Sequence, residues 1–380
     1  MSPVEFVEVQ HGGDELSVVM LVDGERHPIW FRSSVPLSFD RADALVPVGL
    51  LAAMRARTSL RLPGPASAQL LASLEEIQEI LSAFTGRVLT AGQRVDAEPE
   101  IAATRDGRGF GTFFGGGVDA FYTALERERE LTHLVFLQGF DVPDPRSPRA
   151  AIATATALAV AAAMDKQLIE IETNVRDVCE RFGTRNTFWG PALATVALLL
   201  QDQLDRIVFP ANDSYATLEP WGQHPLLDPL WSTEALAVDS DGCEATRVEK
   251  VARVAESELA LRHLRVCNHP KIRLNCGRCE KCLRTMVGLR LAGALDRCAT
   301  LPDAVDLRAL AKLEMAYDPA VVYTRENIAA ARAAGDWPLM LALTWSLRRR
   351  PVRRLRHRLG RLRERARGAM SAAAGTRLTS

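Results

Sequence analysis

The chain has 380 residues, of which 47% are apolar and 25% are charged. This composition is ordinary for a globular protein and excludes a fibrous, collagen-like or wholly disordered chain. Lysine plus arginine and aspartate plus glutamate both number 47, so the formal net charge is zero. The charge is uneven, because residues 348–367 contain eleven arginines and one glutamate and leave the rest of the chain acidic. An acidic body argues against nucleic acid as a partner.

Residues 1–105 predict a small α+β domain. Runs rich in β-forming residues lie at 17–22 and 28–31, and Asp23-Gly24 between them is typical of a turn. Two later segments have apolar residues at helical spacing, 48–57 and 67–84. No residues in this block have the spacing of a catalytic group, so we expect the functional site further along the chain.

Residues 106–265 alternate between predicted strands and helices. The strands are expected at 111–114, 134–137, 168–172 and 206–209, and the helices begin near 119, 148 and 191. Strands separated by helices of this length predict an α/β domain with a parallel sheet and helices on both faces. Ligands of such sheets bind beyond the carboxyl ends of the strands, so we expect the site in the loops that follow the strands.

Three consecutive glycines link the first of these strands to its helix. Without Cβ atoms the backbone can approach a ligand closely, and N–H groups at the start of a helix favour an anion such as phosphate. Asp119 is of the type that caps such a helix. The alternative is a tight turn that binds nothing. The residues that we assign to a phosphate ligand are Phe114, Gly115, Gly116, Gly117, Val118, Asp119 and Ala120.

Polar residues follow two other strands at the same expected edge of the sheet. Gln138 and Asp141 come after the second strand, and Asn212 and Asp213 come after the fourth. We assign Gln138 to the nucleotide, and a carboxylate at this edge could hold Mg²⁺ against a triphosphate. Ordinary turn chemistry is the alternative. Substrate contacts are assigned to Asn212, Asp213, Ser214 and His224. The histidine shares a loop with a tryptophan that could stack on a planar substrate, or the tryptophan is buried and the histidine is on the surface.

Four closely spaced cysteines predict a metal site. They are separated by eight, two and two residues, at Cys267, Cys276, Cys279 and Cys282. Four thiolates suit tetrahedral zinc and leave no open position, so the predicted site is structural. An iron–sulfur cluster and free thiols are the alternatives. We assign the zinc-binding segment and its helix to residues 266–300 and a helical region to residues 301–347.

Residues 348–380 form an arginine-rich tail. Apolar residues recur in it with helical spacing between the arginines, at Val352, Leu355, Leu359 and Leu362. This pattern predicts an amphipathic helix with a basic face, for which solvent, an anionic membrane, RNA or an acidic protein are alternative surroundings. The N-terminus does not read as a signal peptide, and no run reaches the roughly 20 apolar residues of a spanning helix. We therefore expect a cytoplasmic protein whose tail could contact the inner face of a membrane.

The glycine loop resembles the pyrophosphate-binding motif of the PP-loop ATP pyrophosphatases, which usually reads Ser-Gly-Gly-x-Asp-Ser after a strand. Gly116, Gly117 and Asp119 match this motif, whereas Gly115 and Ala120 stand where the family has serine. The cysteine spacing that follows is similar to that of the 7-cyano-7-deazaguanine synthase family. Two shorter segments also resemble that family, Asn212-Asp213-Ser214 and Thr246-Arg247-Val248-Glu249-Lys250. The resemblance covers about residues 110–292.

The resemblance implies a PP-loop (HUP-like) fold and an ATP-dependent enzyme acting on a small molecule. ATP would adenylate a carboxylate or a similar oxygen, and a nitrogen or sulfur nucleophile would then displace AMP. The glycines would hold phosphates, Asp119 would fix the loop, and Arg247 and Lys250 would neutralise developing negative charge. Zinc would be structural, with ATP and Mg²⁺ as substrate and ion. The alternative is a catalytically degenerate nucleotide-binding or scaffold protein that keeps the zinc site.

Overall fold

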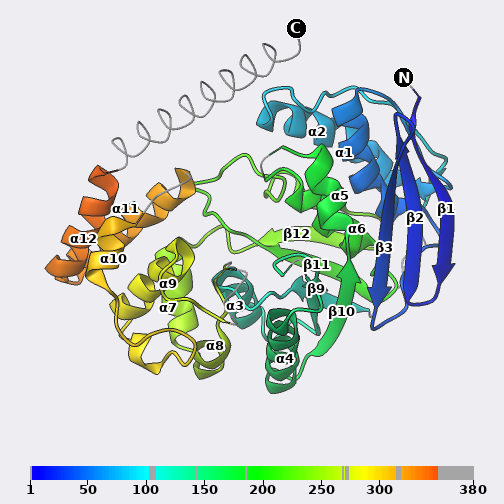
Figure 1. Ribbon diagram of the computed structural model, residues 1–380. Helices are drawn as coiled ribbons and strands as arrows, with labels where there is room; N and C mark the ends of the chain where they lie inside the picture. Colours follow the sequence, from blue (N-terminus) through cyan, green and yellow to red (C-terminus); the bar gives the residue numbers. More distant parts are fainter. Residues whose placement is uncertain are drawn as a thin grey trace, which may run out of the picture.

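The protein is an α/β structure built on one large sheet. The computed structural model describes residues 2–101, 108–142, 144–184, 186–267, 269, 274–313 and 318–349. Within them, a ten-stranded and largely parallel sheet has the order β12-β11-β8-β9-β10-β3-β2-β1-β4-β6, and β5 and β7 form a separate short pair. Helices flank the sheet (Figure 1).

The elements run along the chain as follows. The strands are β1 Val4–Gly12, β2 Glu15–Val22, β3 Glu25–Ser33, β4 Leu60–Arg61, β5 Ala66–Ser67, β6 Val95–Asp96, β7 Pro99–Glu100, β8 Gly109–Phe113, β9 His133–Gln138, β10 Gln167–Thr173, β11 Leu204–Pro210 and β12 Ala237–Asp241. The helices are α1 Val46–Ala56, α2 Ala68–Phe84, α3 Val118–Glu126, α4 Pro148–Ala163, α5 Val175–Phe182, α6 Trp189–Leu198, α7 Arg247–Ala255, α8 Glu258–His263, α9 Glu280–Leu291, α10 Leu307–Lys312, α11 Asp318–Ala333 and α12 Trp337–Arg348.

The predicted parallel sheet with helices on both faces is confirmed. Strands β8 to β12 pair in parallel, with Val135 of β9 opposite Phe113 of β8. Neighbouring side chains of β9 lie in different apolar cores. Val135 packs in the core that contains α1, α5 and α6. Leu134 and Phe136 pack in the core that contains α3, α4 and α7. Burial on both faces explains the nearly continuous buried runs of β8 and β9.

The N-terminal strands continue the same sheet. Strand β3 pairs antiparallel with β10, which places Arg32 opposite Glu172. Between β2 and β3, Asp23 and Gly24 both have positive φ angles, as the predicted turn requires. One apolar core contains residues from both sides of residue 105, so the predicted N-terminal block and the parallel strands share a sheet and a core.

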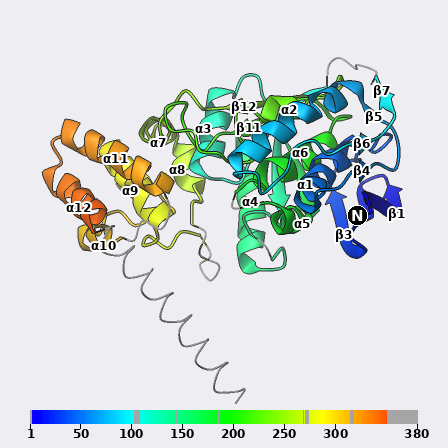
Figure 2. The ribbon, with the colours of Figure 1, turned by 90° about the horizontal axis from the view of Figure 1, so that it is seen from above.

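The C-terminal helices form the end of the molecule opposite to β1 (Figure 2). Helix α7 packs on α3 and α9, and α11 packs on α7, α9 and α12. Residues 301–347, predicted to be helical, contain α10, α11 and α12. The arginine-rich tail lies outside the described residues from position 350 onward. No helix among the described residues is long and apolar enough to cross a membrane.

Candidate functional site

The three glycines form the turn between β8 and α3 at the carboxyl edge of the parallel strands. Gly116 has a φ of 74°, which only glycine adopts readily, and Gly117 is the N-cap residue of α3 in an extended conformation. A Cβ atom on Gly115 would lie 2.7 Å from Oδ2 of Asp141. The acidic side chain therefore occupies the space in which the serine of the PP-loop motif would stand.

The predicted helix cap is corrected by the structure. Asp119 lies inside the first turn of α3, and no side chain caps this helix among the described residues. The first N–H groups of α3 therefore have no capping side chain among the described residues, and donors in this position favour an anion. The side chains of Phe114, Val118 and Ala120 are buried, and the Phe114 ring packs edge-on against Phe121 at 5.0 Å. Only the backbone of these three residues could contact a phosphate.

Asp119 is held by two buried cations from α7. Its carboxylate lies 2.8 and 3.0 Å from the two terminal nitrogens of Arg247, and its Oδ1 lies 3.6 Å from Nζ of Lys250. A capping box between Thr246 and Glu249 starts α7 at Arg247, which fixes where both cations emerge. The structure therefore brings together the three side chains that the resemblance assigned to catalysis.

Lys250 is the more deeply buried of the two cations, with only 1% of its side chain exposed. Its Nζ donates a hydrogen bond of 2.7 Å to the backbone oxygen of Ala211 at the end of β11. Burial lowers the pKa of Lys250, and the Asp119 carboxylate acts in the opposite direction. Buried charges are tolerated only when they are paired, so the acid and both cations depend on one another.

Arg265 covers the glycine loop. Its backbone N–H donates to the carbonyl oxygen of Gly116 at 2.7 Å, and its Nη2 donates to that of Gly115 at 2.5 Å. The same guanidinium lies 3.6 Å from the half-exposed carboxylate of Asp141. Sequence reasoning missed this residue, and the available signal was its position two residues before Cys267.

The four cysteines form a compact cluster, and their sulfur atoms all lie within 4.8 Å of one another. Two Sγ–Sγ distances are 3.8 and 3.9 Å, for Cys276–Cys282 and Cys279–Cys267. Gly277, with a φ of 67°, makes the turn between the second and third cysteines. The cluster is close enough to bind one metal ion, and a set of four sulfur ligands is compatible with zinc.

Hydrogen bonds shape the chain around these sulfurs. The Asn275 side chain accepts from the N–H groups of Val266 and Cys267 at 2.9 and 3.1 Å and donates to the carbonyl of Leu264. The buried Arg149 of α4 donates to the backbone carbonyls of Cys267 and His269. Cys267 is thereby held by hydrogen bonds both within its own loop and to helix α4 of the parallel sheet.

Helix α9 links the cysteines to the glycine loop from a second side. Cys279 is its N-cap residue and Cys282 is in its first turn, with Lys281 between them. Burial lowers the pKa of Lys281, and the charge of Asp141 opposes this effect. One turn along the helix, the Arg284 guanidinium lies over the Tyr323 ring at 4.3 Å. Arg265, before the first cysteine, and Lys281, between the last two, therefore bring positive charge near the loop and Asp141.

The predicted substrate residues after β11 are tied to α11. The Tyr323 hydroxyl donates to the Asp213 carboxylate at 2.6 Å, and the backbone oxygen of Asn212 accepts from Nη2 of Arg247 at 3.2 Å. Burial raises the pKa of Asp213, while Tyr323 and Arg247 act to lower it. The hydroxyl of Ser214 lies 3.0 Å from that of Thr217. Gln138, assigned to the nucleotide, is the last residue of β9, and its amide lies 3.5 Å from the hydroxyl of Thr154 of α4.

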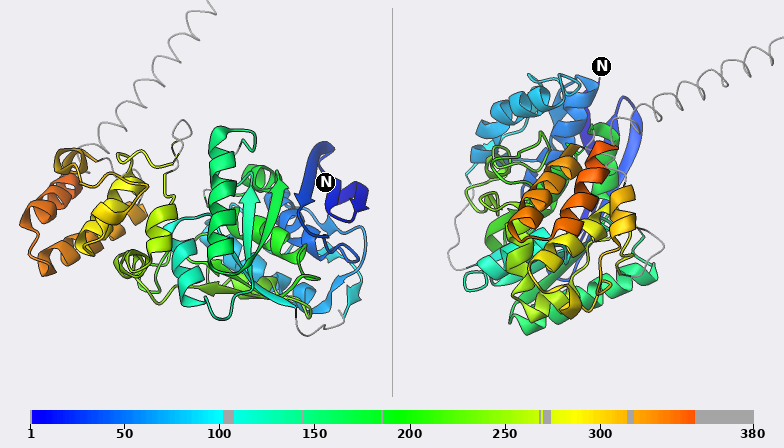
Figure 3. Two further views of the ribbon diagram at one scale, coloured as in Figure 1. Left: turned by 90° about the horizontal axis from the view of Figure 1, so that it is seen from below. Right: turned by 90° about the vertical axis from the view of Figure 1, so that its left-hand side faces the viewer.

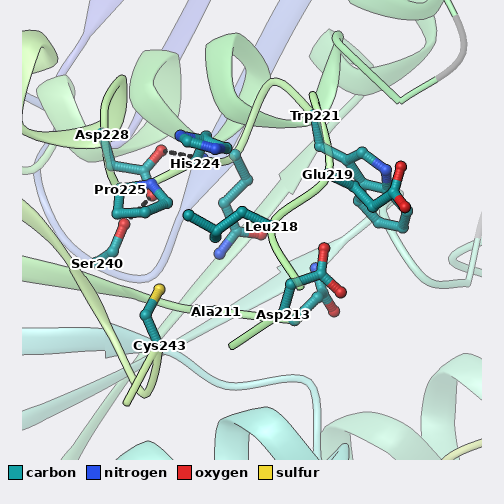
Figure 4. A pocket seen from close by; sticks show the side chains of 12 residues that line it. Ala211, Asp213, Leu218, Glu219, Trp221, His224, Pro225, Asp228, Ser240 and Cys243 are labelled. Carbon is teal, nitrogen blue, oxygen red and sulfur yellow. Dashed lines mark hydrogen bonds between the residues drawn. The ribbon is translucent and has the colours of Figure 1, made fainter. Parts of the chain in front are cut away.

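His224 lies in a pocket at the ends of β11 and β12 (Figure 4). The ring is buried and packs against Phe84 at 5.0 Å, so the alternative with a surface histidine is wrong. Its Nδ1 accepts from the N–H group of Leu226 at 3.1 Å, and burial lowers the pKa of the imidazole. Asn212 and Asp213 line the same pocket, so three of the predicted substrate residues share it.

The buried carboxylate of Asp228, which also lines this pocket, should make the stability of the folded protein depend on pH. Its carboxylate is fully buried, and burial raises its pKa to about 7, while hydrogen bonds from Ser240 at 2.5 Å and the backbone of His224 act against this shift. The folded chain keeps a proton that the unfolded chain releases above about pH 4, so the free energy of unfolding should fall as pH rises from about 4 to 7.

We expect Asp228→Asn, which cannot ionise, to flatten this dependence and to exceed the unmodified chain in stability at pH 8 by about 1–2 kcal/mol. Urea unfolding of both proteins at pH 5 and pH 8 measures the difference. Equal pH dependence in the two proteins would contradict the assignment of the buried proton to Asp228.

Comparison of the chain with protein-family models, with curated proteins and with solved structures finds no match. The functional interpretation therefore depends on the geometry of the site and on the resemblance of its motifs.

Proposed function

We propose that the protein is an ATP-dependent enzyme of the PP-loop type, similar to 7-cyano-7-deazaguanine synthase, with a HUP-like nucleotide-binding fold. The observation that carries the proposal is the glycine turn at the end of β8, which leads into an uncapped helix and is surrounded by cations. Backbone donors and nearby cations of this kind suit a polyphosphate.

The chemistry proposed is adenylation followed by substitution. A carboxylate oxygen of a small molecule attacks the α-phosphorus of ATP, the bond to the bridging oxygen breaks, and pyrophosphate leaves. A nitrogen or sulfur nucleophile then attacks the carbonyl carbon of the adenylate, and AMP leaves. The N–H groups that start α3 stabilise the charge that develops on the departing pyrophosphate. Arg247 and Lys250 hold α3 in place through Asp119 and add positive charge beneath the loop.

Asp141 is the group that we propose to hold Mg²⁺ against the phosphates. It is half exposed, it stands next to Gly115 where the PP-loop motif has serine, and Mg²⁺ typically combines one or two carboxylates with phosphate oxygens. Gly115 leaves room for this carboxylate. The missing serine is thereby replaced by a different ligand for the same phosphates.

We propose that the cysteine cluster holds zinc and that its role is structural. Four protein sulfurs leave no position for a substrate. Two residues next to the cluster approach the glycine loop. Arg265, which precedes the first cysteine, donates a hydrogen bond to Gly115, and the charge of Lys281, which lies between the last two cysteines, interacts with that of Asp141. Zinc would thus fix the positions of two cations relative to the phosphates.

Adding a Cβ atom at position 115 tests the space between the loop and Asp141. We expect Gly115→Ala to displace the carboxylate and weaken ATP binding in the presence of Mg²⁺ about tenfold, or about 1.4 kcal/mol. Asp141→Asn should cost a similar amount, and the double variant should cost little more than either, since both act on one contact. The control is Gly64→Ala, where no atom lies within 4 Å of the added Cβ.

Exchange of labelled pyrophosphate into ATP tests the proposed reaction itself. Adenylation is reversible, so the zinc-loaded protein should catalyse exchange when the correct carboxylate is added and not without one. A panel of small heterocyclic and aliphatic carboxylates provides the candidates. ATP binding with no exchange from any of them would favour the alternative, a nucleotide-binding or scaffold protein that has lost the chemistry.

A further inference from the structure

Helix α12 has an apolar face that points away from the protein. Its inner face is buried through Leu339, Ala342 and Leu343, which belong to the core shared with α9 and α10. On the outer face, Trp337 and Trp345 are 55% and 56% exposed. A surface helix normally carries polar residues on its outer face, so one that is apolar on both sides requires something to cover it.

The exposed residues of α12 form one stripe, which we call the α12 stripe: Trp337, Pro338, Leu341, Trp345 and Arg348. At 100° per residue these positions fall within an arc of about 100°. Leu341 is 62% exposed, and Arg348 at the end of the helix is the only charged member of the stripe. Figure 3 shows α12 with α11 on the outside of the C-terminal end of the molecule, where nothing described in the chain covers it.

The charge of the chain that follows identifies the partner. Residues 348–367 contain eleven arginines against one glutamate. Tryptophan and leucine beside a concentration of arginines are the residue types that bind the surface of an anionic bilayer, where tryptophan lies at the headgroup level and arginine pairs with lipid phosphates. Nucleic acid would also attract the arginines, but it offers no apolar phase for Leu341 and Pro338.

We propose that the α12 stripe docks the protein on an anionic phospholipid surface. Contact is peripheral, with the apolar side chains of the stripe buried near the headgroups, and the arginine content of the sequence that follows favours anionic lipid. This inference does not depend on the proposed ATP chemistry. It places the C-terminal end of the molecule on the membrane, with the N-terminal strands at the opposite end (Figure 2).

Vesicle sedimentation with the full-length, zinc-loaded protein tests the proposal. Vesicles of phosphatidylcholine with about 30% phosphatidylserine should bind it, vesicles of phosphatidylcholine alone should bind far less, and about 0.5 M salt should weaken the binding. Trp337→Ser/Leu341→Ser/Trp345→Ser should reduce partition into the anionic vesicles by about tenfold or more. Replacing the eight arginines from 353 to 367 with glutamine should produce a loss of similar size.

The matched control removes exposed apolar residues elsewhere. Ile101→Ser/Leu158→Ser replaces side chains that are likewise exposed but lie outside the α12 stripe, and it should bind vesicles as the unmodified chain does. Unchanged binding by the triple variant would overturn the proposal. If the unmodified chain is a dimer in the absence of vesicles and the triple variant is a monomer, a second copy of the chain covers the stripe. That result would overturn the proposal too. Binding to RNA but to neither kind of vesicle would overturn it as well.

Discussion

Replacing one cysteine of the cluster should have the largest effect on the protein. We expect Cys282→Ser to lose the bound metal and to lower the free energy of unfolding by several kcal/mol, on the order of 5, because metal binding contributes directly to the stability of such segments. The Cys282 side chain is fully buried and its sulfur lies within 4.8 Å of those of the other three cysteines, so the serine cannot avoid the cluster. Metal content by mass spectrometry and urea unfolding measure the two effects.

Cys298→Ser is the matched control for the cysteine variant. Cys298 is also buried, but it lies outside the cluster, and its Sγ is 3.6 Å from the hydroxyl of Thr300, which a serine could use as a hydrogen-bond partner. This variant should keep its metal and lose about 1 kcal/mol or less. Equal metal content and equal stability in the two variants would show that the cysteines hold no structural metal.

The second large effect should come from replacing Asp119, whose carboxylate pairs with two buried cations. We expect Asp119→Asn to lower the free energy of unfolding by about 3 kcal/mol, because it removes the carboxylate that pairs with both buried cations, Arg247 and Lys250. The same change should abolish ATP binding, because α7 would no longer hold the start of α3 beneath the glycine loop. Urea unfolding and nucleotide titration of the same preparation separate the two effects.

Glu130→Gln is the control for the acid. Glu130 also faces two arginines, Arg127 at 3.2 Å and Arg206 at 3.9 Å, but about half of its side chain is exposed to solvent. Ion pairs of this kind contribute little, so the variant should lose less than about 1 kcal/mol and bind ATP normally. A similarly small loss for Asp119→Asn would contradict the idea that the buried cations depend on it.

Much of the parallel sheet could be predicted because its strands and helices have distinct periods. The apolar run at 134–137 and the helical spacing from 148 predict their own type of structure, and both elements are present, as β9 and α4. The cysteine spacing was equally informative, since ligands two residues apart must lie close together. These are local patterns, and a sequence records local patterns directly.

Contacts between distant segments could not be predicted in the same way. Nothing in β3 indicates that it pairs with β10, because a half-buried strand carries the same alternation whichever partner it has. The contact between Asp213 and Tyr323 joins residues 110 positions apart. Asp119 was expected to cap α3, but Gly117 occupies the cap position, and the acid is satisfied by cations that only the folded chain supplies.

Calorimetric titration of the zinc-loaded protein with ATP and Mg²⁺, beside AMP, tests whether the glycine loop binds ATP through its phosphates. We expect micromolar ATP binding, about −8 kcal/mol, and at least tenfold weaker binding of AMP, which lacks the phosphates that the glycine loop and Asp141 would hold. No binding at millimolar ATP, or equal affinity for the two nucleotides, would contradict this expectation. The chain would then be an α/β protein with a four-cysteine cluster, whose glycine turn holds a different ligand or none.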